Sequence, residues 1–408
     1  MSANSTRSTR IDIVLLYLAR GVRGFGDGFA IIILPAYLSA IGFSSIQIGI
    51  IVSASLLGTA LLTLAVGFIA PRHDLRNFLL GGAVLMSCTG LAFPNVELFA
   101  IIAIIAFVGT INPSTGDLGV LVPLEHAMLA QGVPDAERTR TFARYSLIGA
   151  LSMAAGSLAA ALPDFMTSAG IDRVNAFKIM FYIYAALGLL CAALYRLLPH
   201  ARMDETRPSA PLGPSRKVVY KLAALFSLDA FAGGFVVQSL LALWLFIHFD
   251  MSLSAASVFF FWTSTLSAFS YPVAAWLSKR FGLVNTMVFT HIPSSIFLIA
   301  AAFSPNLILA LALLLVRAAL SQMDVPTRTS YVMAVVTPAE RTAAASVTAV
   351  PRSFASSLSP ALAGAMLAMP FSGLPLVLCG VLQIAYDLAL LISFQHVKPP
   401  EEKALRQA

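Results

Sequence analysis

The sequence predicts an all-α integral membrane protein in which twelve transmembrane helices form two pseudo-symmetric six-helix bundles. Its 408 residues are 58% hydrophobic and only 11% charged, whereas soluble domains carry roughly 25% charged residues. The apolar segments run for roughly 18 to 28 residues, which is enough to cross about 30 Å of hydrocarbon at 1.5 Å per residue. The first half of the chain also reappears, weakly but in register, in the second half.

The hydropathy pattern predicts helices at residues 11–38, 45–70, 77–94, 98–123, 141–162, 176–198, 218–247, 253–277, 284–303, 306–333, 342–368 and 373–394. We expect an N-terminal bundle over 1–198, a cytoplasmic linker over 199–217, and a C-terminal bundle over 218–408 that ends in a short cytoplasmic tail. The linker is rich in Pro, Ser and charge, which is typical of a flexible connection. Arg20, Arg23 and Asp27 interrupt the first apolar run, so we expect a retained helix and not a signal peptide.

The internal repeat is clearest at two places. Residues 25–29 (Phe-Gly-Asp-Gly-Phe) match residues 231–235 (Phe-Ala-Gly-Gly-Phe). Residues 134–139 (Pro-Asp-Ala-Glu-Arg-Thr) follow the fourth segment as residues 338–342 (Pro-Ala-Glu-Arg-Thr) follow the tenth. A duplicated helical bundle in a bilayer is typical of secondary transporters.

Basic residues gather in the loops on one side of the predicted membrane. Arg10 precedes the first segment and Arg140 follows the fourth, whereas the opposite loops offer only Arg173 with Lys178 close by. The positive-inside rule therefore places both termini in the cytoplasm, with the helices in the inner or plasma membrane. The net charge of +7 follows from this topology, so we expect no nucleic-acid partner.

Two loops carry a degraded form of a known motif. After the second segment the chain reads Gly67-(x)4-Arg72-(x)3-Arg76, and after the eighth it reads Ala-(x)4-Arg280-Phe-Gly282. With the twelve segments in two similar halves, this resembles the major facilitator superfamily (MFS) of secondary transporters. The resemblance implies alternating access by rocking of the two halves around a central cavity lined by helices 1, 4, 7 and 10.

The loop positions are candidates for a cytoplasmic gate. A glycine such as Gly67 can let two helices approach closely, and a nearby arginine can pair with a carboxylate or with carbonyls at a helix end. We expect Arg144 to pair with Glu125 or Glu137; simple anchoring of basic residues in the cytoplasm is the alternative for Arg72 and Arg280. The gate candidates are Gly67, Arg72, Arg76, Glu125, Glu137, Arg138, Arg144, Arg280, Gly282, Glu340 and Arg341.

Charged and polar side chains inside the apolar segments give the more specific signal. A central Arg or Asp costs roughly 2.5 to 3.5 kcal/mol unless it pairs or meets water. Arg20, Arg23 and Asp27 share one helical face, and so do Arg317, Asp324 and Arg328. The candidates for substrate binding and coupling are Arg20, Arg23, Asp27, Asn112, Asp117, Asp229, Gln238, Arg317, Asp324, Arg328 and Arg352.

The repeat places Arg23 opposite Asp229, and we hypothesise that they pair across the pseudo-two-fold axis. Arginine keeps its proton in proteins, so proton coupling needs a carboxylate or histidine. Asp27, then Asp324, then Asp229 are the expected coupling residues, with permanent structural ion pairs as the alternative. His291 is expected to be an interhelical hydrogen-bonding residue, and Asp387 is given similarly low weight.

Several chemistries lack their motifs. The sequence has no phosphate-binding loop, no His/Cys cluster with metal-ligand spacing and no nucleophile motif. We therefore expect no enzyme, no cofactor and no metal. The leading hypothesis is a secondary transporter of a small organic solute, with an anion favoured by the arginines and a proton or exchange gradient as the driving force. The expected partners are this solute, protons and membrane lipid, and the expected functional unit is the monomer. Two alternatives remain: a proton-driven antiporter for efflux of amphipathic compounds, and a receptor or scaffold that carries no solute.

Overall fold

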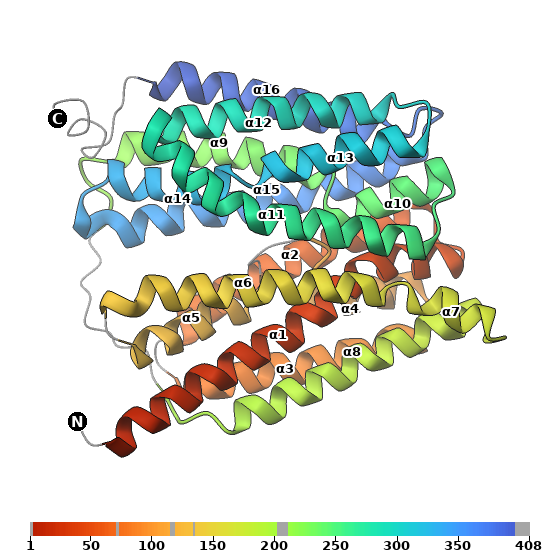
Figure 1. Ribbon diagram of the computed structural model, residues 1–408, viewed down its shortest axis with the longest axis horizontal. Helices are drawn as coiled ribbons and strands as arrows, with labels where there is room; N and C mark the ends of the chain where they lie inside the picture. Colours follow the sequence, from red (N-terminus) through yellow and green to blue (C-terminus); the bar gives the residue numbers. More distant parts are fainter. Residues whose placement is uncertain (1–2, 71–72, 115–118, 134, 202–210, 396–408) are drawn as a thin grey trace. The chain divides into compact units, whose positions relative to one another are not determined.

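The computed structural model describes residues 3–70, 73–114, 119–133, 135–201 and 211–395 (Figure 1). Its α-helices are α1 (Ala3–Ala40), α2 (Ser45–Ile69), α3 (Leu75–Ala92), α4 (Phe99–Val108), α5 (Leu121–Gly132), α6 (Asp135–Ala159), α7 (Leu162–Ser168), α8 (Arg173–Arg196), α9 (Arg216–Gly234), α10 (Gln238–Phe249), α11 (Leu253–Phe281), α12 (Leu283–Ala302), α13 (Leu307–Ser321), α14 (Asp324–Val335), α15 (Arg341–Leu367) and α16 (Leu374–Phe394). Short 3₁₀ turns lie at Phe93–Asn95 and Pro338–Glu340.

Several helices begin where the sequence supplies a polar cap. Ser44 and Gln47 form a reciprocal capping box at the start of α2. The Asp172 carboxylate accepts hydrogen bonds from the first amides of α8, and the Asn306 side chain accepts one from Leu309 at the start of α13. These caps satisfy amides that have no partner within the helix, which fixes where the helices begin.

Ten helical stretches of the described residues are long and apolar enough to cross a membrane. The predicted all-α membrane class is therefore confirmed, while twelve spans are not directly confirmed. The predicted fourth helix at 98–123 is broken into α4 and α5, and the buried Asn112 lies in the break between them. The predicted eleventh helix corresponds to α15, which does not count among the ten apolar stretches.

The chain forms two compact units. The first comprises Met1–Glu205 together with Val237–Phe261, and the second comprises Thr206–Val236 together with Trp262–Ala408. The predicted seventh helix at 218–247 is split into α9 and α10, which belong to different units. Residues 237–261 thus group with the first unit, although they follow the linker in the sequence. The division of the chain into two bundles at the linker 199–217 stays a prediction.

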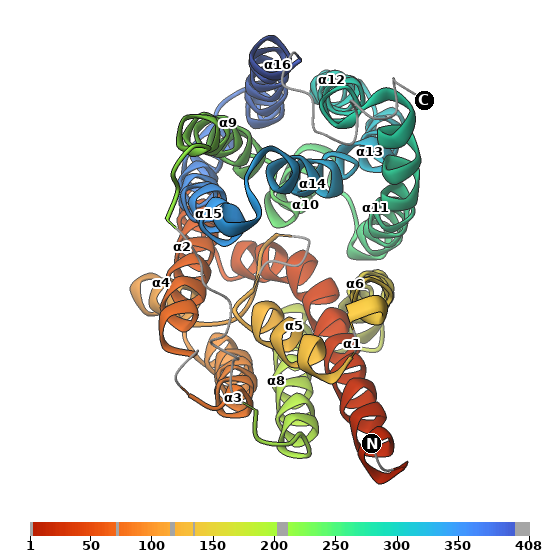
Figure 2. The same ribbon diagram turned by 90° about the vertical axis from the view of Figure 1, so that its left-hand side faces the viewer.

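In the first unit α1 packs along α6 and α8, and α3 packs along α8 (Figure 2). Glycines allow the α1–α6 crossing: a Cβ on Gly24 would lie 2.8 Å from the carbonyl oxygen of Gly149, and one on Gly28 would lie 2.9 Å from the amide nitrogen of Ser157. These distances are shorter than van der Waals contact. Gly24 and Gly28 therefore serve close helix packing, as small residues do in membrane proteins.

The second unit repeats this arrangement. Here α9 packs along α15, and α12 packs along α16 (Figures 1 and 2). A Cβ on Gly234 would lie 2.6 Å from the carbonyl oxygen of Ser356 on α15. Gly234 is the repeat equivalent of Gly28, so each unit places a glycine of the same motif at a close helix crossing.

Two motif glycines differ in their roles. Gly67 is exposed, and a Cβ there would meet no atom within 4 Å. The expectation that Gly67 brings two helices together is therefore wrong. Gly282 has a φ of 89° at the start of α12, a left-handed conformation that favours glycine.

The neighbouring glycines Gly233 and Gly234 provide a matched test of the helix crossing. We expect Gly234→Ala to lower the melting temperature of the purified protein, because the added methyl group forces α9 away from α15 at a cost of about 1–3 kcal/mol. Gly233→Ala meets no atom within 4 Å, so it should leave the melting temperature unchanged or slightly higher. Equal losses in both variants would contradict the assigned crossing.

Candidate functional site

A buried ion pair lies at the centre of the first unit. Arg23 on α1 donates to the Glu125 carboxylate on α5, and the two residues are 6% and 0% exposed. The hydroxyl of Tyr145 on α6 donates to the same carboxylate, and the Tyr195 hydroxyl on α8 donates to it across 2.6 Å. Glu125 is thus held from three other helices in the interior of the unit, and its role in a gate stays a prediction.

Asp27 lies one helical turn beyond Arg23 and accepts a hydrogen bond of 3.4 Å from the Tyr184 hydroxyl. Arg23, Asp27, Asn112 and Tyr184 help to line a cavity of 40 Å³ within this unit. A cavity needs about 10–15 Å³ by this measure to hold one water molecule. The Asp27 carboxylate therefore faces a space that a few water molecules can fill, which suits a group that exchanges protons.

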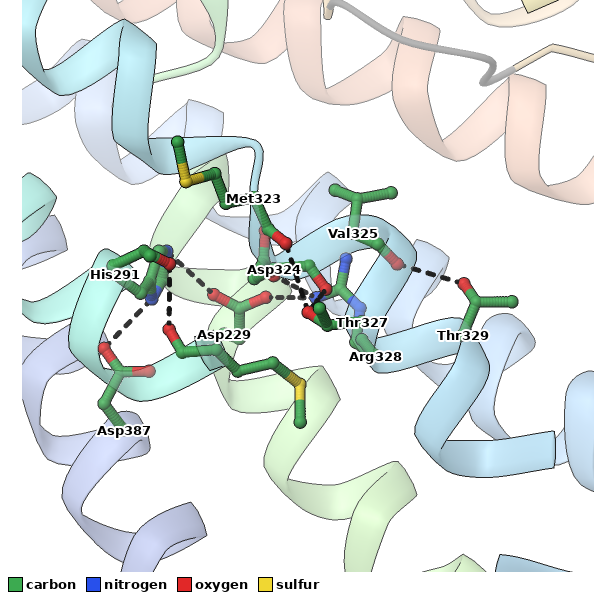
Figure 3. A network of polar contacts seen from close by, with 11 residues as sticks. Asp229, His291, Met323, Asp324, Val325, Thr327, Arg328, Thr329 and Asp387 are labelled. Atoms are coloured by element: carbon green, nitrogen blue, oxygen red, sulfur yellow. Dashed lines mark hydrogen bonds and ion pairs between the residues drawn. The ribbon is translucent and has the colours of Figure 1, made fainter. Parts of the chain in front are cut away.

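The second unit contains a larger buried cluster of charges (Figure 3). Arg328 on α14 donates to Asp229 on α9 across 2.8 Å and lies 3.1 Å from Asp324, one turn earlier on its own helix. The guanidinium of Arg328 also lies over the Phe226 ring, 5.4 Å from its centre. The guanidinium of Arg328 can therefore form an ion pair with either of the two carboxylates.

His291 on α12 extends this cluster toward α16. Its Nδ1 lies 3.0 Å from Asp387 Oδ2, and its Nε2 lies 4.0 Å from Asp229 Oδ1 (Figure 3). Ser295, one turn further on α12, donates to Gln383 on α16. His291 thus forms the predicted interhelical hydrogen bond. Its titratable ring also lies beside Asp229, a contact that the sequence does not predict.

The two ion pairs occupy equivalent positions of the repeat with their charges exchanged. Arg23 corresponds to Asp229 through the Phe-containing motif. Arg138 and Arg341 set an offset of 203 residues in the later motif, and the same offset relates Glu125 to Arg328. The first unit therefore carries Arg on its first helix and Glu on its partner, while the second carries Asp and then Arg.

The hypothesised pair between Arg23 and Asp229 joins residues of different units and stays a prediction. Each residue has an oppositely charged partner within its own unit: Glu125 for Arg23 and Arg328 for Asp229. The expected pair of Arg144 with Glu125 is wrong, because Arg144 is exposed and Glu125 is fully buried against Arg23. The repeat shows which positions correspond but carries no information on which carboxylate a given arginine can reach.

The other intramembrane candidates are distributed as follows. Arg20 stacks over the Tyr145 ring at 5.2 Å; Asn112 lies in the α4–α5 break, and Gln238 lies at the start of α10. In the part of the chain that the structure describes, neither Arg317 nor Arg352 has an ion-pair partner, and the Nε of each is buried without a hydrogen bond. Asp117 and the gate candidate Arg72 lie outside the described residues.

The near end of the central linker is fixed to the first unit. Asp74 caps α3 and accepts hydrogen bonds from the Ala201 amide and the His200 ring. Arg76 donates to the carbonyl oxygen of Arg196 across 2.6 Å. Burial acts to raise the pKa of Asp74, but the hydrogen bonds from His200, Ala201 and Arg76 outweigh it and leave that pKa lowered.

The far end of the linker is fixed to the second unit by Glu340. Its carboxylate accepts hydrogen bonds from the Thr337 and Ser215 hydroxyls, each across 2.7 Å, and from the Gly213 amide. These bonds lower the pKa of Glu340 to about 2. Glu340 therefore ties the start of α9 to the turn before α15.

The remaining gate candidates lie at the ends of helices. Arg138 donates to the Ala130 carbonyl oxygen across 3.2 Å, and Arg280 lies over the Trp276 ring at 5.9 Å. Glu137 and Arg341 are exposed. The structure therefore joins Asp74 with Arg76 within the first unit, and Glu340 with the linker within the second.

The residues that complete these clusters are harder to find in the sequence. Tyrosines such as Tyr145, Tyr184 and Tyr195 are common in apolar helices, and no spacing rule links them to a carboxylate twenty or more positions away. For His291 and Asp387 a signal was present, because ionisable residues inside membrane helices are rare unless paired. Among the described residues, no cluster of three or more His, Cys, Asp or Glu side chains is suited to hold a metal ion.

Comparison with known proteins agrees with this architecture. The family model of the major facilitator superfamily matches residues 16–360. The chain belongs to the major facilitator superfamily, and it is a membrane transporter, not an enzyme. A curated relative, the uncharacterised membrane protein YJR124C of Saccharomyces cerevisiae (strain ATCC 204508 / S288c), is 25% identical over 433 residues and covers 97% of each chain.

Solved structures of transporters share the fold. The nucleoside transporter NupG superposes with a TM-score of 0.74 at 14% identity, covering 94% of this chain and 99% of that one. The xylose transporter XylE from E. coli gives 0.70 at 15% identity, covering 93% and 95%. A bacterial homologue of the human lysosomal transporter Spinster gives 0.69 at 17% identity, covering 96% of each chain.

We expect Glu125→Gln to lower the melting temperature strongly, because it leaves Arg23 buried without its counter-ion, a change that costs about 3–5 kcal/mol. Combining it with Arg23→Gln should recover part of the loss, since both charges are then removed. Glu97→Gln, at an exposed position, is the matched control and should have little effect. A double variant that is as unstable as the sum of the two single variants would contradict the pairing.

The lowered pKa of Glu340 predicts a pH-dependent contribution to stability. A folded-state pKa of about 2 lies below the unfolded value of about 4.3. The contribution is therefore fully present above about pH 4.3 and is lost as the pH falls through about 2. Glu340→Gln should melt at a lower temperature than wild type at pH 7, and the gap should narrow as the pH falls through this range. The exposed Glu137→Gln is the control; a gap independent of pH would contradict the prediction.

Proposed function

We propose that this protein is a proton-coupled secondary transporter of a small organic anion that works by alternating access between its two units. The observation that carries the proposal is that, in the described part of the chain, the charge of Arg352 on α15 is unpaired. It lies close enough to interact electrostatically with Asp229, Asp324 and Arg328, yet it has no ion-pair partner among the described residues. An arginine held this way inside a bundle of apolar helices is available to a carboxylate or phosphate group of a solute.

The neighbouring carboxylates supply the coupling. An anion at Arg352 adds negative charge beside Asp229 and Asp324, so their protonated forms become more favourable. A proton at either carboxylate likewise strengthens binding of the anion, because the coupling between two ligands is reciprocal. Arg328 contacts both carboxylates and stays paired with the one that remains ionised.

Proton-driven export of amphipathic compounds is the second candidate, and the first unit favours it. Asp27 faces a cavity whose lining includes Leu62 and Met86, and a carboxylate with apolar neighbours suits a lipophilic cation. Arg23 lines the same cavity, and this cation weighs against such a ligand. A receptor or scaffold role without transport is weaker, because it gives no reason to retain several buried charges.

The proposal includes orientation and assembly. The basic loops on one side support cytoplasmic termini in the inner or plasma membrane. The proposed functional unit is a single chain. The linker anchors at Asp74 and Glu340 would then lie on the cytoplasmic side.

Transport by purified protein in liposomes tests the proposal. With an imposed pH gradient we expect uptake of organic carboxylates or phosphate esters, accompanied by a change in an internal pH-sensitive dye, and none of nucleosides, sugars or lipophilic cations. Arg352→Gln should reduce anion uptake by at least tenfold, whereas Arg352→Lys should keep part of it because the charge remains. Movement of lipophilic cations alone would favour the exporter, and no movement of any solute would favour the scaffold.

A further inference from the structure

The ring of His291 lies between two carboxylates that come from different helices. Asp387 on α16 is bonded to its Nδ1 at 3.0 Å, and Asp229 on α9 faces its Nε2 at 4.0 Å. All three residues are at most 6% exposed. A neutral imidazole has one nitrogen with a hydrogen and one with a lone pair. One of the two carboxylates must then face a lone pair, which is unfavourable in a buried site, unless a further proton is present.

The charge balance around this ring also requires a proton. Asp387 on α16, Asp229 on α9 and Asp324 on α14 interact with the ring; Arg328 pairs with Asp229 and Asp324, and Arg352 on α15 interacts with the same two carboxylates. Three carboxylates and two guanidinium groups leave one negative charge. Burying a net charge among apolar helices is unfavourable, and one proton on the histidine removes it. Tyr386, the other titratable neighbour, packs its ring edge against His291 and carries no charge at neutral pH.

Asp387 provides a second place for the proton. Its Oδ2 is bonded to His291, while its Oδ1 is buried without a hydrogen-bond partner in the described structure. A carboxylate that is 0% exposed and has one free oxygen can hold a proton there and still accept the histidine hydrogen bond. The proton can therefore lie on the ring or on Asp387 without any change of backbone.

The site is specific to the second unit. The offset of 208 residues between Arg72 and Arg280 places Ala83 at the position of His291, and the offset of 203 residues places Tyr184 at the position of Asp387. Tyr184 instead donates to Asp27. The first unit therefore has no equivalent His–Asp pair at these positions, although its ion pair is the counterpart of Asp229–Arg328.

We infer that His291 and Asp387 form a proton-binding site that controls the ion pair of Asp229. With the proton on His291, the imidazolium and Arg328 share the negative charge of Asp229. When the proton leaves, Asp229 depends on Arg328 alone, and the balance of Arg328 between Asp229 and Asp324 changes. This inference rests on the proposed proton coupling for its role in transport, whereas the existence of the site can be tested without any solute.

The test is nuclear magnetic resonance of purified full-length protein with ¹⁵N-labelled histidine in lipid nanodiscs. The chain has six histidines, and His291→Gln identifies the signal of interest by its loss. At pH 7 we expect this signal to be that of an imidazolium, with hydrogen on both nitrogens, and to become that of a neutral ring in Asp387→Asn. Asp387→Glu should keep the imidazolium, and His248→Gln, in the first unit, should leave the signal unchanged.

Two results would overturn the inference: a neutral His291 at pH 7 in wild type, or an imidazolium that persists in Asp387→Asn. The first needs only wild type and the assignment variant, so poor folding of Asp387→Asn does not remove the test. Transport adds a separate result, measured on any anion that the liposome panel identifies. Asp387→Asn should keep exchange of that anion across the membrane but lose accumulation driven by a pH gradient at least tenfold; equal loss of both would refute control of coupling. Absence of proton-coupled transport in wild type would refute the proposed function alone, and the imidazolium would still report the site.

Discussion

The structure depends on two buried ion pairs, each formed within the unit that contains it. An ionised side chain in an apolar helix costs several kcal/mol unless a counter-charge or water is near. Arg23 meets this need through Glu125 and two tyrosine hydroxyls, and Arg328 meets it through Asp229 and Asp324. Each pair joins two helices of one unit, so it holds that unit together.

The exchange of charge between the two pairs gives the units different chemistry on the same frame. Arg328 has a second carboxylate, that of Asp324, 3.1 Å away on its own helix. The ion-pair partner of Arg23 in the described structure is Glu125, and Asp27, one turn further on α1, lines a cavity together with Arg23. The arginine of the second unit is therefore shared between two carboxylates, whereas that of the first unit is paired with one.

Much of the architecture could be predicted because it follows from local pattern. Apolar segment length gave the membrane helices, and the repeated glycine motif gave equivalent close crossings at Gly28 and Gly234. The charged face of α1 also follows from helical spacing. The predicted common face of Arg317, Asp324 and Arg328 is interrupted, because α13 ends at Ser321 and α14 begins at Asp324. The partners could not be predicted, because Glu125 lies 102 positions from Arg23 and its contact depends on how α1, α5, α6 and α8 pack. The prediction of a close helix approach at Gly67 was wrong for the same reason. A motif locates a glycine in the sequence but does not show which atoms lie against it.

His291 has more charged neighbours than the sequence predicts. The expected contact is one interhelical hydrogen bond, yet the ring lies beside Asp229 on α9 as well as Asp387 on α16. An imidazole between two carboxylates makes the charge of the Asp229–Arg328 pair depend on a group that need not contact the solute. Binding of a proton and binding of an anion can then both change the electrostatic environment of Arg328 and Arg352. Because such coupling is reciprocal, a proton site on α12 and α16 can govern solute affinity without lining the path that the solute takes.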